Sequence, residues 1–106
     1  MNKEILLVVE AVSNEKGVPK DLIFEAIEAA LASATRKKHG GDIEVRVAID
    51  RDSGDYETFR RWEVIDDSET SVLEEPKAQI TLAAARESEP EIQPGDFVEE
   101  PMESIG

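Results

Sequence analysis

The chain contains no cysteine and only one histidine, His39. Without cysteine it can form neither a disulfide framework nor a thiol nucleophile nor a thiolate metal site. A single histidine also excludes a histidine pair for zinc and a histidine–nucleophile constellation within the chain. We interpret His39 as a solvated residue at a helix end, and no glycine-rich phosphate loop is present. The sequence therefore offers no catalytic residue and no metal or cofactor site, and we expect the protein not to be an enzyme.

Long hydrophobic runs are also missing. No uncharged apolar stretch approaches the ~20 residues that a membrane-spanning helix needs. The beginning of the chain includes a short apolar run, but Glu4 and Glu10 flank it and no small-residue cleavage site follows, so it is a poor signal peptide. The 106 residues are 40% apolar, which is enough for one domain with a modest core. We therefore expect a soluble, cytoplasmic protein with no membrane contact.

Positive charge is scarce in the second half of the chain. The net charge is −13; residues 1–62 hold ten Lys/Arg and twelve Asp/Glu, whereas residues 63–106 hold two and thirteen. Because free-standing nucleic-acid-binding proteins are usually basic overall, the total argues against that function. Seven of the twelve basic residues nevertheless fall between positions 36 and 61, which leaves room for a local basic face on an acidic body.

The clearest structural pattern lies in residues 43–65. Apolar residues first alternate with others, as in a half-buried strand, at Ile43, Val45, Val47 and Ile49. The turn-forming sequence RDSGD and a second strand, YETFRRWEVI, follow and predict a β-hairpin. Phe59 and Trp62 are three residues apart, so we expect a bulge at Arg60-Arg61 that turns both rings inward; without it the two rings lie on opposite faces. The turn has a passing likeness to a calcium loop but lacks its spacing and closing glutamate, and we interpret it as a plain hairpin turn.

Two helices are predicted before the hairpin. The first has an apolar face at helical spacing, formed by Ile5, Val8, Val9 and Val12. The second runs from Pro19, which suits the start of a helix, to about Lys38, and Gly40-Gly41 supply its end. Its predicted apolar stripe consists of Leu22, Ile23, Ala26, Ile27, Ala30, Leu31 and Ala34. We expect this helix to lie across the hairpin.

The second half of the chain is rich in turns and acidic residues. An acidic loop is expected over residues 66–77, a short helix over 80–86 with Thr81 as its cap, and a final extended segment over 96–102. The predicted fold class is α+β. In it, two N-terminal helices pack on a small sheet built around the hairpin, with a short third helix and a short last strand.

Six basic residues are the candidate binding residues: Arg36, Lys37, Lys38, Arg46, Arg60 and Arg61. The first three suit the C-terminal end of a helix, where cations complement the helix dipole. The three arginines of the hairpin can simply pair with the acidic residues beside them. Alternatively, the helix end and the outer hairpin face form one basic surface for phosphate or an acidic partner. The residues alone leave both interpretations open.

Four segments resemble the N-terminal domain of the bacterial transcription termination/antitermination factor NusA: residues 1–38, IEVRVAIDRDSGDYETFRRWEVI, ITLAAAR and GDFVEE. The second helix followed by the hairpin with FRRWEV is the most specific part of a likeness that covers essentially the whole chain. It implies that residues 1–106 form an RNA-polymerase-binding N-terminal domain. In the family a further helix, an OB-type RNA-binding domain and two KH domains follow. We expect the chain to be truncated before them, so their RNA-binding activities are not ascribed to it.

The resemblance implies a non-enzymatic factor that binds RNA polymerase beside the RNA exit channel, chiefly at the flap tip of the β subunit. In the family this contact enhances pausing and hairpin-dependent termination, and supports antitermination with other Nus factors. On this hypothesis the flap tip docks on an apolar groove, while the six basic residues face a nascent RNA hairpin as a secondary contact. We also expect a monomer without a cofactor. The alternative is an independent RNA-binding domain, which the −13 charge and the shortage of exposed aromatic residues disfavour.

Overall fold

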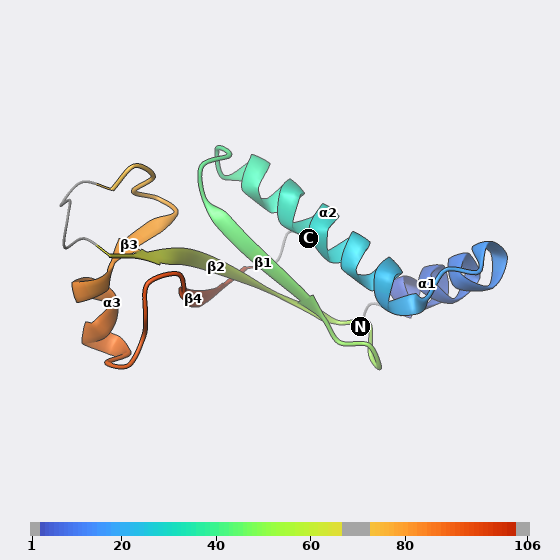
Figure 1. Cartoon of the computed structure of the whole chain (residues 1–106). Coiled ribbons are helices and arrows are strands. Elements are labelled where there is room, and N and C mark those ends of the chain that lie inside the picture. Colours follow the sequence, from blue (N-terminus) through green and yellow to red (C-terminus); the bar gives the residue numbers. More distant parts are fainter. Residues whose placement is uncertain (1–2, 67–72, 104–106) are drawn as a thin grey trace.

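The computed structural model describes residues 3–66 and 73–103 of the chain. In these residues the elements follow one another (Figure 1) as α1 (Lys3–Lys16), α2 (Lys20–Lys38), β1 (Glu44–Ile49), β2 (Tyr56–Ile65), β3 (Gln79–Thr81), α3 (Leu82–Ser88) and β4 (Phe97–Met102). The predicted α+β class is confirmed, with the two N-terminal helices, the hairpin, the third helix and the last strand in the expected order. Half of the predicted acidic loop at 66–77, residues 67–72, lies outside the described residues, and the other half, 66 and 73–77, forms no helix or strand.

The hairpin of β1 and β2 is the centre of the sheet. The two strands pair antiparallel without interruption along the whole of β1. The expected bulge at Arg60-Arg61 is therefore wrong, and Phe59 and Trp62 lie on opposite faces. A bulge is unnecessary because an arginine guanidinium covers each ring on its own face of the sheet. The Arg46 guanidinium is 4.6 Å from the centroid of Phe59, and that of Arg60 is 4.6 Å from the centroid of Trp62.

Strand β2 has three neighbours. β4 pairs antiparallel with its middle, and β3 runs parallel to its last three residues. The backbone of Val64 bonds to Gly95 and Asp96 just before β4, whereas the N–H of Glu63 donates to the carbonyl of Ala78 just before β3, at 2.8 Å. Because successive residues of a strand direct their backbone groups to opposite edges, β3 lies on the same edge of β2 as β1.

The short helix predicted at 80–86 begins two residues late. Ile80 and Thr81 belong to β3, a strand that the sequence pattern did not reveal, and α3 starts at Leu82. The predicted cap is confirmed, because the Oγ1 atom of Thr81 accepts a hydrogen bond from the N–H of Ala84 at 3.2 Å. Thr81 therefore closes a strand and opens a helix at the same position.

Two hydrophobic cores lie along the length of β2. The first joins the hairpin to α1 and α2, and its buried members are Val9, Phe24, Ala32, Ile43, Val45, Val47 and Ile49. The second joins β2 to α3 and to the turn before β4, and its buried members are Val64, Ala85 and Ile92. Figure 1 shows α2 lying along the hairpin, with α1 and α3 at opposite ends of the molecule. The result is an elongated domain with extents of 52 × 28 × 23 Å.

Helix α2 lies on the hairpin as expected, but the buried face differs from the predicted stripe. Ile23, Ile27 and Leu31 of that stripe pack against the first core as predicted. Its other members, Leu22, Ala26, Ala30 and Ala34, are exposed, whereas Phe24 and Thr35 are buried. The Phe24 ring removes far more apolar area from water than an alanine does, so it decides which side of the helix faces β1. Thr35 can be buried with it because its hydroxyl donates to the carbonyl of Leu31 at 2.8 Å.

Helix α1 attaches to the body by one side. Val9 is buried and Ile5 and Leu6 pack on the first core. Val8, which the sequence pattern placed on the buried face, is 53% exposed, and Leu7 is 69% exposed. None of the described helices is long and apolar enough to cross a membrane.

Both outer edges of the sheet carry a feature that limits further pairing. On the free edge of β1 the N–H of Ile49 donates to the carboxylate of Glu28 at 2.8 Å. On β4, Pro101 is paired with Phe59, and its neighbours Glu100 and Met102 direct their backbone groups toward β2. Its backbone nitrogen, which carries no hydrogen, is therefore directed to the open edge.

Candidate functional site

The last turn of α2 carries Arg36, Lys37 and Lys38. The two lysines are exposed and Arg36 is half-buried. The chain leaves the helix through Gly40 and Gly41, whose positive φ angles of 94° and 88° suit glycine, and the N–H of Gly41 donates to the carbonyl of Arg36 at 2.8 Å. Within the described residues no carboxylate pairs with these three cations. Their charge is therefore available to a partner.

Arg46 and Arg61 lie on the sheet face opposite α2, and Glu99 of β4 holds both. The Nε and Nη2 atoms of Arg46 donate to the two oxygens of the Glu99 carboxylate at 2.7 and 3.0 Å. The Nε atom of Arg61 is 3.3 Å from the same carboxylate, without the alignment of a hydrogen bond, and its guanidinium lies 3.6 Å from the centroid of Phe97. The hydrogen bonds from Arg46 hold the pKa of Glu99 below its ordinary value, and Glu99 raises the pKa of Arg46.

The same face carries further carboxylates. The strand registers place three more acidic side chains on it, those of Glu44, Glu57 and Glu63. This face therefore holds four carboxylates, Glu99 included, against two guanidinium groups. Such a balance repels phosphate, so the face is a poor surface for RNA.

Arg60 lies on the α2 side of the sheet, beside Trp62. Its Nη2 atom donates to the carbonyl of Lys77 at 2.8 Å, and its buried Nε atom has no partner among the described residues. The Lys77 ammonium in turn lies 3.4 Å from the carboxylate of Asp42, in the loop that follows His39, the C-cap of α2. These contacts bring two more basic residues to the end of α2. We name the α2-end cluster by its members: Arg36, Lys37, Lys38, Arg60 and Lys77.

The six predicted basic residues thus do not form one surface. Four of them belong to the α2-end cluster, and Arg46 and Arg61 lie on the opposite face of the sheet. Sequence reasoning missed Lys77 and Glu99 as participants. Both contact the hairpin from distant positions, 17 residues from Arg60 and 53 from Arg46, and no local pattern encodes such contacts.

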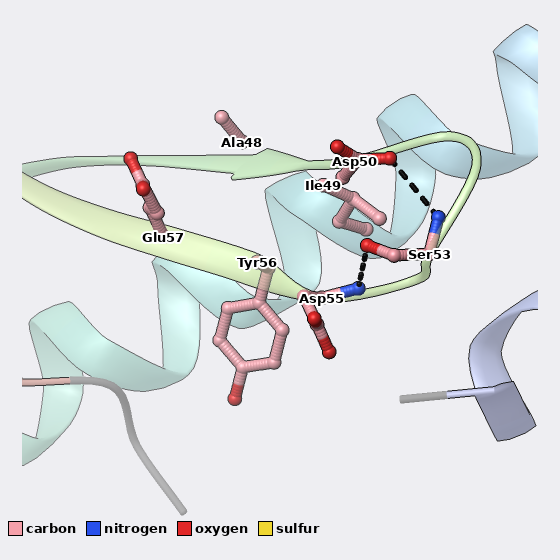
Figure 2. Close-up of a pocket in the computed structure, with 7 residues that line it drawn as sticks. All are labelled: Ala48, Ile49, Asp50, Ser53, Asp55, Tyr56 and Glu57. Carbon is pink, nitrogen blue, oxygen red and sulfur yellow. Dashed lines mark hydrogen bonds between the residues drawn. The ribbon is translucent and has the colours of Figure 1, made fainter. Parts of the chain in front are cut away.

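A pocket of about 400 Å³ lies at the hairpin turn (Figure 2), lined by Ala48, Ile49, Asp50, Ser53, Asp55, Tyr56 and Glu57. Several of its polar groups are used by the turn. The Oδ1 atom of Asp50 accepts from the N–H groups of Asp52 and Ser53, at 2.8 and 3.0 Å, and the Ser53 hydroxyl oxygen accepts from the N–H of Asp55 at 3.1 Å. Within residues 3–66 and 73–103, no group of three or more His, Cys, Asp or Glu is placed to hold a metal ion.

The family of the chain follows from comparison with known proteins. A family model described as the NusA N-terminal domain matches residues 4–106. The chain belongs to this family. Two curated relatives, the NusA proteins of Rickettsia conorii and Rickettsia prowazekii, are each 31% identical over 104 residues, which is 98% of this chain. Both are named transcription termination/antitermination proteins, and the chain spans 20% of their length.

A solved structure supports the same family at the level of the fold. The solution structure of the N-terminal domain of NusA from B. subtilis matches with a TM-score of 0.71 and 34% identity. The match covers 97% of this chain and 79% of that one. The resemblance to the NusA N-terminal domain read from the sequence is therefore confirmed in both sequence and fold.

Proposed function

We propose that this NusA N-terminal domain is a non-enzymatic module that binds RNA polymerase beside the RNA exit channel, with the flap tip of the β subunit as its main contact. There it modulates pausing and hairpin-dependent termination, and supports antitermination with other Nus factors through a longer protein. Membership of the NusA N-terminal family over residues 4–106 carries the proposal. The module acts as a cytoplasmic monomer and needs no cofactor.

In this function the α2-end cluster faces the nascent RNA hairpin. Its members at positions 36–38 are unpaired within the described residues and lie at one end of a helix, on a chain whose net charge is −13. Positive charge gathered at one place attracts the phosphates of a folded RNA hairpin, while the acidic remainder of the surface repels RNA. Arg46 and Arg61 serve instead to join β1, β2 and β4 through Glu99.

Independent RNA binding has weaker support. A surface that binds RNA alone needs exposed aromatic faces on which bases stack. Phe59, Trp62 and Phe97 each lie against an arginine guanidinium of the domain itself. An arginine therefore covers a face of each of these three rings, and Tyr56, the other aromatic residue of β2, packs against the first core. Among the described residues, the hairpin is poorly suited to stack bases.

An NMR titration of the isotope-labelled chain tests the proposal. One titration uses a peptide of the β flap tip and the other a short RNA hairpin. We expect chemical-shift changes with the peptide, and with free RNA only weak changes confined to the α2-end cluster. Strong, salt-sensitive shifts with RNA and none with the peptide reject polymerase binding in favour of an RNA-binding domain.

A further inference from the structure

Residues 73–96 form a small lobe at the α3 end of the domain (Figure 1). The small lobe comprises β3, α3 and the segments that flank them, and we name α1, α2, β1, β2 and β4 the main body. The lobe is built on the second core, which has three buried members among the described residues, against seven in the first core. Because burial of apolar side chains is the main favourable contribution to folding, the lobe is held less firmly than the main body.

The parts of the small lobe are tied to one another by hydrogen bonds. The Nε atom of Arg86 donates to the carbonyl of Ile92 at 3.0 Å, and the N–H of Gln93 donates to the carboxylate of Asp96 at 3.0 Å. Thr81 caps α3 within the same segment. These bonds join α3 to the turn that follows it, so the residues of the lobe are expected to open together.

The attachment of the lobe to the main body is short. Only the three residues of β3 pair with β2, and the N–H of Gly95 donates to the carbonyl of Val64 at 2.9 Å. The lobe also carries six Asp/Glu and two Lys/Arg, so its own charges repel one another. With seven residues, α3 is too short to persist as a helix once it leaves β2. A segment with these properties belongs to the less stable end of a structure.

Lys77 belongs both to the small lobe and to the α2-end cluster. Its carbonyl accepts a hydrogen bond from Arg60 at 2.8 Å, and its ammonium lies 3.4 Å from the carboxylate of Asp42. When the lobe opens, Lys77 leaves the end of α2 and Arg60 loses the carbonyl that holds its guanidinium. Only the basic residues at 36–38 then keep their places in the cluster. Because attraction for phosphates grows with the number of cations gathered, the closed lobe gives the stronger phosphate site.

We propose that the small lobe opens as a unit while the main body stays folded, and that RNA bound at the α2-end cluster holds the lobe closed. A ligand that prefers the closed form shifts the equilibrium toward it. By reciprocity, an open lobe weakens RNA binding by the same factor. The link to RNA rests on the proposed function, whereas the opening of the lobe does not depend on it.

Hydrogen exchange followed by NMR on the 106-residue chain tests the opening without any ligand. The amides of Glu89, Ile92 and Gly95 report on the lobe, because each donates a backbone hydrogen bond that the opening breaks. The amides of the β1–β2 ladder report on the main body. We expect protection factors in the lobe to be about tenfold or more below those of the ladder.

Two matched core variants separate local opening from global unfolding. Ile49→Val removes one methylene from the first core and should lower ladder protection about two- to tenfold. Lobe protection should stay within about twofold, because the first core remains intact when the lobe opens. Ile92→Val removes the same group from the second core and should lower both sets, since the lobe is built on β2 and is lost whenever the main body unfolds. Both changes are small enough to keep the fold.

A short RNA hairpin, titrated at low salt until the shifts of the α2-end cluster saturate, tests the link to RNA. We expect it to raise lobe protection about threefold or more. Lys77→Gln should lose most of this rise while keeping the ligand-free protection, because the side chain of Lys77 is 65% exposed and its carbonyl is retained. Lys16→Gln, which removes a cation outside the cluster, is the matched control and should keep the rise.

The outcomes that overturn the inference are distinct. Equal protection in lobe and ladder, or an equal fall in both after Ile49→Val, means that the domain opens only as a whole. Shifts at the α2-end cluster without a rise in lobe protection overturn the link to RNA and leave the proposed function standing. A rise that survives Lys77→Gln contradicts the role given to Lys77. If RNA causes no shifts at the cluster, the RNA contact of the proposed function fails together with the link, and the ligand-free exchange alone decides whether the lobe opens.

Discussion

A single carboxylate, that of Glu99, holds two arginines on the sheet face opposite α2. Its side chain is 26% exposed, and both of its oxygens accept a hydrogen bond from Arg46, which fixes the orientation of the carboxylate. Bonds between two charged groups in such a fork geometry are stronger than neutral ones, and partial burial limits their screening by water. Because Arg46 belongs to β1, Arg61 to β2 and Glu99 to β4, this one residue joins three strands.

We expect Glu99→Gln to lower the free energy of unfolding by about 1–2 kcal/mol, since the neutral amide leaves two half-buried guanidinium groups without their counter-charge. Urea denaturation followed by circular dichroism measures the change. Glu100→Gln is the control, because Glu100 is the exposed neighbour in β4, and it should change the free energy by less than about 0.5 kcal/mol. An equal loss in both variants contradicts the assigned role of Glu99.

The lowered pKa of Glu99 also predicts a pH dependence of stability. The folded protein holds this group ionised to lower pH than the unfolded chain does, so its contribution is present above the unfolded pKa of about 4.3 and is lost as pH falls through the folded value. The free energy of unfolding should therefore decline below about pH 4.5, and less steeply in Glu99→Gln than in wild type. Identical slopes in urea titrations between pH 3 and 6 count against this prediction.

At the scale of elements, the hairpin was predictable because its signals are local. Alternating apolar residues and turn formers with Gly54, whose φ angle is 81°, specify it without outside help. The absence of a bulge was not predictable, because it depends on which arginine covers which ring. Strand β3 was missed for a similar reason: three residues pair with β2 through contacts that no local periodicity records.

The buried face of α2 gives an element-scale prediction. Phe24→Ala removes a buried ring from the first core and should cost about 3 kcal/mol or more of stability. Leu22→Ala, two residues earlier on the exposed side, should cost less than about 0.5 kcal/mol from lost contacts. Chemical denaturation of both variants checks the orientation of the helix. A large loss for Leu22→Ala and a small one for Phe24→Ala means that the helix is rotated toward the stripe first predicted.

At the scale of the whole molecule, charge and apolar surface are separated along one long axis. Leu7 and Val8 are exposed on α1 at one end, and the α2-end cluster lies at the far end of α2. Composition predicted a basic region on an acidic body, and the structure reduces that region to one end of a helix. The sequence could not predict that Lys77 contacts Arg60 or that Glu99 pairs with Arg46 and Arg61. These contacts depend on which strands the chain brings together.

Under the proposed function, this separation predicts that an RNA contact and a polymerase contact can be weakened independently. Lys37→Gln with Lys38→Gln should reduce crosslinking to the RNA hairpin in a paused complex several-fold, since two phosphate contacts are lost. Affinity for the flap-tip peptide should not change. Lys16→Gln, which removes a cation from the last turn of α1, is the matched control and should leave the RNA crosslink intact. Equal effects of the double variant and the control contradict the assignment of RNA binding to the end of α2.

The blocked edges of the sheet have a consequence for how the domain behaves at high concentration. An open strand edge is a template on which a second chain can add a strand, and repeated addition produces aggregates. Here a neighbouring carboxylate occupies one donor of β1, and proline deletes a donor from β4. At these two positions the sheet therefore offers no free backbone N–H to a second chain, which removes two sites for unintended pairing.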